Sequence, residues 1–436
     1  MNFELNNFEL NKVMNIKFRL TLLNFMEFAV WGAYLTSMGR YLSSAGLEDQ
    51  IPYFYSVQGF VSLIMPALMG IVADRWIQAQ KTLSLCQLIA GISMCAAAFY
   101  GNSAGANADF GTLFGLYTLS VAFYMPTIAL TNSVAYAALE GAGMDTVKAF
   151  PPIRVWGTIG FIVSMLCVDW GGLQDKPWQF AVSGVLSIIM AFYALTMPAC
   201  KIDKTKKAAS FVDALGLRAF TLFNQRKMAI FFIFSMLLGS ALQITNGYAN
   251  PFIASFGAEE AYANTFGVQH TNTLISLSQM SETLCILLIP FFLKRFGIKI
   301  VMLMSMFAWV FRFGFFAIGD PGFPGVILLI LSMIVYGIAF DFFNISGSLF
   351  VDKETDLNIR SSAQGLFMMM TNGLGASIGM LLAGQVIKHY TYGTKIGDVK
   401  YILGDWSACW YIFAAYALVV AVLFAILFRY KHVREK

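Results

Sequence analysis

The chain has 436 residues, of which 58% are hydrophobic and only 12% are charged, and its mean hydropathy is +0.67. An average soluble domain carries about 25% charged residues. The composition therefore excludes a soluble globular protein and indicates an integral membrane protein. The formal net charge of +5 is compatible with nucleic acid or acidic lipid as a partner, so its distribution along the chain decides between them.

Twelve apolar stretches stand between polar breaks and have lengths suited to crossing a bilayer, for which a helix needs about 20 residues. In chain order we expect transmembrane helices over residues 18–39, 52–73, 82–101, 110–137, 154–168, 178–198, 228–256, 268–293, 300–318, 325–351, 362–388 and 407–429. The predicted fold class is an all-α integral membrane protein.

The Lys and Arg residues are divided unevenly between the two sides of these spans. With both termini in the cytoplasm, most of the 29 lie in inner segments, and the outer segments hold only Arg40, Lys176, Lys388, Lys395 and Lys400. This distribution follows the positive-inside rule and predicts a multi-pass membrane protein with both termini cytoplasmic. The excess positive charge thus orients the chain, and no nucleic-acid partner is expected.

The longest inner loop divides the spans six and six. We expect a disordered N-terminal tail over residues 1–17, six-helix bundles over 18–198 and 228–429, a cytoplasmic linker over 199–227, and a cytoplasmic tail over 430–436. Ser210 and Asp213 have the spacing of a capping box ahead of an apolar pattern, which favours an amphipathic helix on the inner membrane face. A flexible tether whose charge fixes the topology is the alternative.

Short basic turns follow the second helix of each half. The first reads GIVADR over residues 70–75, and the second reads KRFGIK over residues 294–299. The first resembles the signature loop of the major facilitator superfamily, in which two six-helix bundles rock around a midplane site. We expect Asp74 and Arg75 to lock the inner gate by pairing across the bundles.

Three carboxyl groups lie inside predicted spans. Asp341 is at the middle of residues 325–351, Glu282 lies within 268–293, and Glu27 is nearly as deep in the first span. Such groups are costly in lipid and normally face a polar cavity that has a function. The chain is therefore expected to move a solute across the membrane. Arg312, near the outer end of its span, is expected to snorkel or to form an ion pair.

Polar and aromatic residues recur at helical spacing on several spans, which places them on shared faces. These residues are Arg154, Thr158, Phe161, Gln243, Asn246, Gln279, Glu282, Tyr336, Phe340, Asp341 and Asn344. Together they suit a neutral ligand with many hydroxyl groups and a flat ring, such as a nucleoside. For Gln243, Asn246 and Thr158 the alternative is a hydrogen bond to a neighbouring helix.

Several long strings closely resemble the bacterial nucleoside:proton symporters of the major facilitator superfamily. They include FPPIRVWGTIGF (150–161), LQITN (242–246), SQMSETL (278–284) and IVYGIAFDFFNISGS (334–348), and the resemblance runs from about Met14 to His432. It implies an inner-membrane nucleoside importer driven by the proton gradient. The family positions that line the nucleoside site match Arg154, Thr158, Phe161, Gln243, Asn246, Gln279, Glu282, Tyr336, Phe340 and Asp341. Glu27 departs from the family, where a neutral amide is expected.

A carboxyl group in a low-dielectric cavity has a raised pKa, so it can take up a proton when the cavity opens to the outer side. On this ground we expect Asp341 to be the proton-coupling carboxyl and Glu282 to be mainly a substrate ligand, with Glu27 as a second candidate carrier. The expected partners are nucleosides such as uridine or adenosine, protons and the lipid bilayer, with a monomeric protein and no cofactor or metal. Three alternatives remain at this point: a sugar:proton symporter of the same fold, a drug:proton antiporter and a nucleoside-binding membrane sensor. The antiporter is disfavoured because the fifth span lacks the Gly-Pro-rich motif usual in that class. Enzyme activity is not expected, because His270, His389 and His432 are far apart and no catalytic motif is present.

Overall fold

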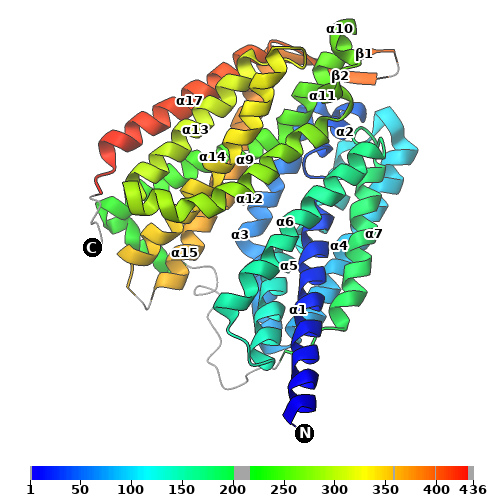
Figure 1. Ribbon diagram of the computed structural model, residues 1–436. Coiled ribbons are helices and arrows are strands. Elements are labelled where there is room, and N and C mark those ends of the chain that lie inside the picture. Colours follow the sequence, from blue (N-terminus) through cyan, green and yellow to red (C-terminus); the bar gives the residue numbers. More distant parts are fainter. Residues whose placement is uncertain (1, 201–216, 357–358, 398, 431–436) are drawn as a thin grey trace.

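A computed structural model of the chain describes residues 2–200, 217–356, 359–397 and 399–430. The helices form two bundles (Figure 1). The N-terminal bundle contains α1 (Asn2–Gly32), α2 (Met38–Ser44), α3 (Ile51–Arg75), α4 (Ala79–Ala104), α5 (Phe110–Gly141), α6 (Thr146–Trp170) and α7 (Trp178–Leu195). The C-terminal bundle contains α9 (Arg226–Ser255), α10 (Glu260–Ala263), α11 (Phe266–Gln269), α12 (Thr271–Phe296), α13 (Ile298–Ile318), α14 (Gly325–Glu354), α15 (Arg360–Met368), α16 (Ala376–Tyr390) and α17 (Trp406–Leu427).

Among the described residues, 11 helices are long and apolar enough to cross a membrane. The helix α1 is not one of these, and its apolar part carries Lys17, Arg19 and Glu27. It nevertheless packs against α5, α6 and α7 inside the N-terminal bundle. The long apolar helices confirm the prediction of a helical membrane protein. Lipid offers the backbone no hydrogen-bond partners, so apolar stretches that cross it form helices.

The structure differs from the sequence-based expectation at three places. Helix α1 begins at Asn2, so the stretch expected to be a disordered tail is helical. The strands β1 (Thr391–Ile396) and β2 (Val399–Gly404) form an antiparallel hairpin that an all-α fold class does not include. In the linker, a 3₁₀ helix, η3 (Leu217–Asn224), stands where the amphipathic helix was expected to continue, and residues 201–216 lie outside the described part of the chain.

The helices α1 and α6 approach each other backbone to backbone. A Cβ atom at Gly160 would stand 2.1 Å from the carbonyl oxygen of Phe25, and one at Gly32 would stand 2.3 Å from that of Phe161. Small residues allow such approaches between membrane helices, where close packing replaces the hydrophobic effect as the driving force. This contact positions the face of α6 that carries Arg154 and Phe161.

The substitution Gly160→Leu is therefore expected to destabilise the protein by at least about 2 kcal/mol, because α1 and α6 must separate to make room. The measurement is the thermal unfolding midpoint of the purified protein in detergent. Gly115→Leu on α5 is the matched control, because a Cβ atom at Gly115 meets nothing within 4 Å. Equal midpoints for the two variants would contradict this account of the contact.

The two bundles are joined near the end of the molecule that carries the β1–β2 hairpin, which we call the hairpin end. They diverge toward the opposite end, where both chain termini lie and which we call the terminal end (Figure 1). At the hairpin end, Lys388 Nζ lies 2.7 Å from Asp49 Oδ2 across the bundles. Somewhat deeper, the hydroxyl of Ser56 donates to the carbonyl of Ser377 at 2.9 Å, and that of Ser377 donates to the carbonyl of Ser56 at 2.7 Å.

A further link between the bundles involves the buried carboxylate of Asp169, at the end of α6. Its carboxylate accepts hydrogen bonds from the backbone N–H of Thr273 at 2.6 Å and from the hydroxyl of the same residue. His270 Nδ1 lies 3.4 Å away, and its ring stacks on Trp170. Since Thr273 is in the first turn of α12, a carboxylate from one bundle caps a helix of the other.

Candidate functional site

The predicted site residues come from helices of both bundles. Arg154, Thr158 and Phe161 lie on α6, and α6 packs against α12 of the C-terminal bundle. The remaining residues lie on the C-terminal helices α9 (Gln243, Asn246), α12 (Gln279, Glu282) and α14 (Tyr336, Phe340, Asp341). The structure therefore brings together on neighbouring helices residues that are up to 187 positions apart in the chain.

A line of charged groups crosses from one bundle to the other. The guanidinium of Arg154 lies 3.9 Å from the centre of the Phe28 ring, and its charge interacts with the carboxylate of Glu282. The charge of Glu282 in turn interacts with that of Asp341. Asp341 is only 5% exposed, and its Oδ2 has no hydrogen-bond partner among the described residues. An ionised carboxylate at such a position is costly unless a proton or a ligand group satisfies it.

Aromatic rings stand beside these charges. The rings of Tyr336 and Phe340 are parallel within 5°, with centroids 5.8 Å apart, because the two residues are one turn apart on α14. Phe161 instead packs edge-on against Trp31 of its own bundle, with centroids 6.4 Å apart. Parallel aromatic faces of this kind can stack on a planar heterocycle.

The amide residues partly pair among themselves. Asn246 Nδ2 donates to Gln243 Oε1 at 3.0 Å on α9, and the side chain of Gln279 hydrogen-bonds the Tyr336 hydroxyl. These pairs fix the orientations of the amide groups and leave other donor and acceptor positions for a ligand. Thr158 is half-buried, one turn beyond Arg154 on α6.

Glu27 lies inside the N-terminal bundle rather than at the surface between the bundles. It is 0% exposed and accepts hydrogen bonds from Gln87 Nε2 at 3.0 Å, Thr127 Oγ1 at 2.6 Å and Thr131 Oγ1 at 2.9 Å. Its charge also interacts with that of Arg154. The sequence does not predict these three donors to Glu27. Their only distinguishing feature in the sequence is that they are polar residues within apolar spans.

The expectation for Arg312 is wrong. Its side chain neither snorkels nor pairs with a carboxylate among the described residues, and it is only 2% exposed. Its Nη1 donates to the carbonyl oxygen of Ser332 at 2.7 Å, and its guanidinium lies 4.6 Å from the centre of the Tyr336 ring. The buried cation thus lies over the ring of Tyr336, one of the two aromatic rings of α14.

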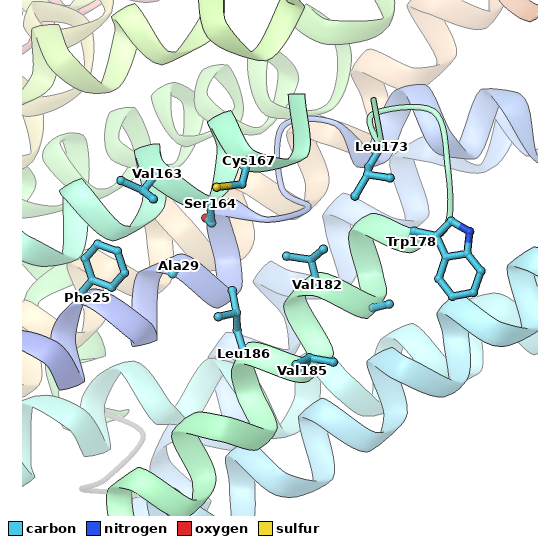
Figure 2. Close-up of a pocket in the computed structure, with 11 residues that line it drawn as sticks. Phe25, Ala29, Val163, Ser164, Cys167, Leu173, Trp178, Val182, Val185 and Leu186 are labelled. Carbon is cyan, nitrogen blue, oxygen red and sulfur yellow. The ribbon is translucent and has the colours of Figure 1, made fainter. Parts of the chain in front are cut away.

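The expected gate residues are far from this cluster. Asp74 and Arg75 are exposed at the end of α3. A cavity of about 520 Å³ also lies away from the cluster, between α1, α6 and α7 (Figure 2). Its lining is almost wholly apolar, with Ser164 and Cys167 as the exceptions, so it lacks the polar groups needed to hold a hydroxyl-rich ligand.

Comparison with known proteins identifies the family. The family model described as "Nucleoside H+ symporter" matches residues 14–433. The chain is 46% identical to the xanthosine permease of Escherichia coli (strain K12), covering 97% of this chain and 98% of that protein. It is also 46% identical to the nucleoside permease NupG of Escherichia coli (strain K12), again covering 97% and 98%.

Solved structures agree with this result. The crystal structure of the nucleoside transporter NupG superposes with a TM-score of 0.86 and 45% identity, covering 96% of this chain and 100% of that one. The xylose transporter XylE from E. coli, at 12% identity and a TM-score of 0.60 over 95% and 99% of the two chains, shares the fold alone. The resemblance seen in the sequence is therefore confirmed, and the chain is a multi-pass membrane transporter and not an enzyme. It belongs to the nucleoside:H⁺ symporter family of the major facilitator superfamily and couples the transport of nucleosides to protons.

Proposed function

We propose that this transporter imports nucleosides such as uridine and adenosine across a bacterial inner membrane, as a monomer with both termini in the cytoplasm. The observation that carries the proposal is the charged line from Arg154 through Glu282 to Asp341, beside the stacked rings of Tyr336 and Phe340. It combines charge, hydrogen-bonding groups and flat apolar faces at the junction of the two bundles. A neutral solute with hydroxyl groups and a heterocycle matches this combination.

The polar groups of the site divide according to the two parts of a nucleoside. Under this proposal, the ribose hydroxyls bind to Glu282 and to the amides of Gln243, Asn246 and Gln279. The base stacks on Phe340 and Tyr336, with Phe161 approaching from the other bundle. Free bases bind weakly under this proposal, because they leave the ribose-binding groups without partners.

Asp341 is the proposed coupling carboxyl. Its buried and unpartnered Oδ2 makes the ionised form costly when the site closes around it. A proton taken up at this carboxyl removes the charge and allows the loaded site to close. Glu282 interacts with Arg154 as well as with Asp341, so it has a compensating cation and acts mainly as a ligand. Glu27, held by three donors, supports the charge of Arg154.

The conformation fits one step of the transport cycle. The bundles are joined at the hairpin end and diverge toward the terminal end (Figure 1). With the termini in the cytoplasm, this state is the one that releases substrate to the inside. When the bundles rock the other way, Asp74 and Arg75 form the inner gate by pairing across the bundles.

The test is uptake of labelled uridine into proteoliposomes with and without an inward proton gradient. Uptake that the gradient stimulates, and that unlabelled adenosine but not glucose or a galactoside inhibits, is the expected result. Absence of uridine and adenosine uptake from liposomes that contain folded protein would contradict the proposal. Inhibition by sugars would instead favour a sugar substrate.

Arg312 offers a prediction about the base-binding face. Arg312→Leu removes the cation that lies over the Tyr336 ring, and buried cation–π contacts contribute about 2 kcal/mol. We expect the KM for uridine to rise about tenfold, with a smaller change in the maximal rate, because the ring is no longer held in position. Arg312→Lys, which keeps the charge, is expected to restore part of the affinity. A KM that is unchanged in Arg312→Leu would contradict a positioning role.

A further inference from the structure

A second, much smaller cavity adjoins the stacked rings of α14. Its volume is about 20 Å³, and it lies between α9, α13, α14 and the π-helical segment η5 (Met369–Gly375), which joins α15 to α16. Its lining residues are Leu238, Gly239, Leu242, Trp309, Ala339, Phe340, Phe343, Asn344, Thr371 and Asn372. One wall is therefore Phe340, the ring on which we place the nucleobase.

Two amide side chains supply polar groups to this cavity. Asn344 Nδ2 donates to the carbonyl oxygen of Phe340 at 3.0 Å, so the amide is fixed and its Oδ1 is an acceptor. Asn372 Nδ2 makes only a weak contact with the sulfur of Met368 at 3.9 Å. Both asparagines are half-buried. Asn372 thus has a donor and an acceptor to offer, and rotation of its amide can present either one.

The backbone around Asn372 is unusual. The segment η5 has π-helical hydrogen bonding, which is rare and is frequently found at functional sites. It also contacts the other bundle, because a Cβ atom at Gly373 would stand 2.3 Å from Leu63 Cδ2 on α3. Asn372, which lines the cavity, is therefore next to a contact between the two bundles. A ligand group bound in the cavity can influence the relative movement of the bundles.

We propose that this cavity receives an exocyclic group of the nucleobase and that Asn344 and Asn372 determine which bases are transported. A water molecule needs about 10–15 Å³ of such space, so a cavity of about 20 Å³ holds one oxygen or one amino group. The ring stacks on Phe340 at the mouth, and its substituent points toward the two amides. This inference rests on the proposed function, because it presupposes that the base lies against α14.

The chemistry of an amide accounts for a broad base range. A keto base such as uracil presents an acceptor and needs a donor from the protein, whereas an amino base such as cytosine presents a donor and needs an acceptor. Asn372 satisfies either by rotating. The wild-type protein is therefore expected to transport uridine and cytidine with similar efficiency.

The test replaces Asn372 by Asp, which has nearly the same shape but, when ionised, only acceptors. In proteoliposomes with an inward proton gradient, the ratio of kcat/KM for cytidine to that for uridine is expected to rise about tenfold in Asn372→Asp. Asn372→Ala, which removes both functions, is expected to weaken both substrates without changing their ratio. The matched control is Asn264→Asp, since Asn264 is exposed at the C-terminal end of α10 and does not line the cavity.

A cytidine-to-uridine ratio in Asn372→Asp that equals the wild-type ratio would overturn the inference. If Asn372→Asp transports neither nucleoside, competition binding on monodisperse purified protein gives the cytidine-to-uridine ratio from affinities. Asn372→Ser provides a second variant, which keeps a neutral donor and acceptor. Failure of the proposed function is distinguishable, because it appears as absence of nucleoside uptake by the wild-type protein itself.

Discussion

Asp341→Asn is expected to abolish the accumulation of uridine driven by a proton gradient while leaving uridine binding and uridine exchange intact. An inward gradient of one pH unit corresponds to about 1.4 kcal/mol per coupled proton, which is enough for about tenfold accumulation. The amide cannot carry a proton through the cycle, so the internal concentration should not exceed the external one. Exchange survives because the neutral amide resembles the protonated carboxyl, which is the form of Asp341 that allows the loaded site to close. The measurement compares gradient-driven uptake with uridine counterflow in the same proteoliposomes.

The matched control for this substitution is Asp352→Asn on the same helix. The side chain of Asp352 is 47% exposed and its Oδ1 lies 3.2 Å from Arg360 Nε, and surface pairs of this kind contribute little. Accumulation should therefore be close to that of the wild type in Asp352→Asn. If Asp341→Asn still accumulates uridine and Glu282→Gln or Glu27→Gln does not, the coupled proton belongs to that other carboxyl.

The arrangement of the helices could be predicted from the sequence to a large extent, because lipid imposes one requirement everywhere. A backbone that crosses the bilayer must satisfy its own hydrogen bonds, so each long apolar stretch becomes a helix. Polar residues at helical spacing on such a helix face the protein interior. This reasoning placed Tyr336, Phe340 and Asp341 on one part of α14 and associated them with Glu282 and Arg154 on other helices.

The remaining features depend on contacts between distant segments, for which the sequence carries no local signal. Arg312 is held by Ser332 and by the face of Tyr336, both on α14, so its own helix gives no indication that it is buried. The donors to Glu27 come from α4 and α5. The hairpin at 391–404 was missed because its strands are short and lie between two apolar spans, where the polar residues were interpreted as an outer loop.

Asp169→Ala is expected to open the hairpin end of the protein. The carboxylate of Asp169 accepts hydrogen bonds from Thr273 of the other bundle and from Gln174 Nε2 at 2.5 Å in its own bundle. Hydrogen bonds to a buried charged group contribute about 1.5–3 kcal/mol each, and a negative charge at the start of α12 also interacts favourably with the helix dipole. Losing about 3 kcal/mol from one conformation shifts the equilibrium between conformations by more than about 100-fold.

The opening can be measured as a distance between spin labels on the two bundles at the hairpin end. Asn102 on α4 and Gln269 on α11 are exposed and suit this purpose, after the six native cysteines are replaced. Asp169→Ala should move the distance distribution toward longer values, whereas Asp175→Asn, in the loop that follows α6, should leave it unchanged. Other hydrogen bonds also cross between the bundles here, from Thr36 Oγ1 to Asn272 Oδ1 at 3.1 Å and from Asn250 Nδ2 to Gln174 Oε1 at 2.9 Å. An unchanged distribution in Asp169→Ala would show that these bonds and the Ser56–Ser377 pair hold this end closed without the carboxylate. A shift of the distance distribution together with faster binding of external uridine would establish that the carboxylate of Asp169, which caps α12, controls access from the outside. The reason is that a group that stabilises only the closed outer end opposes substrate loading from that side.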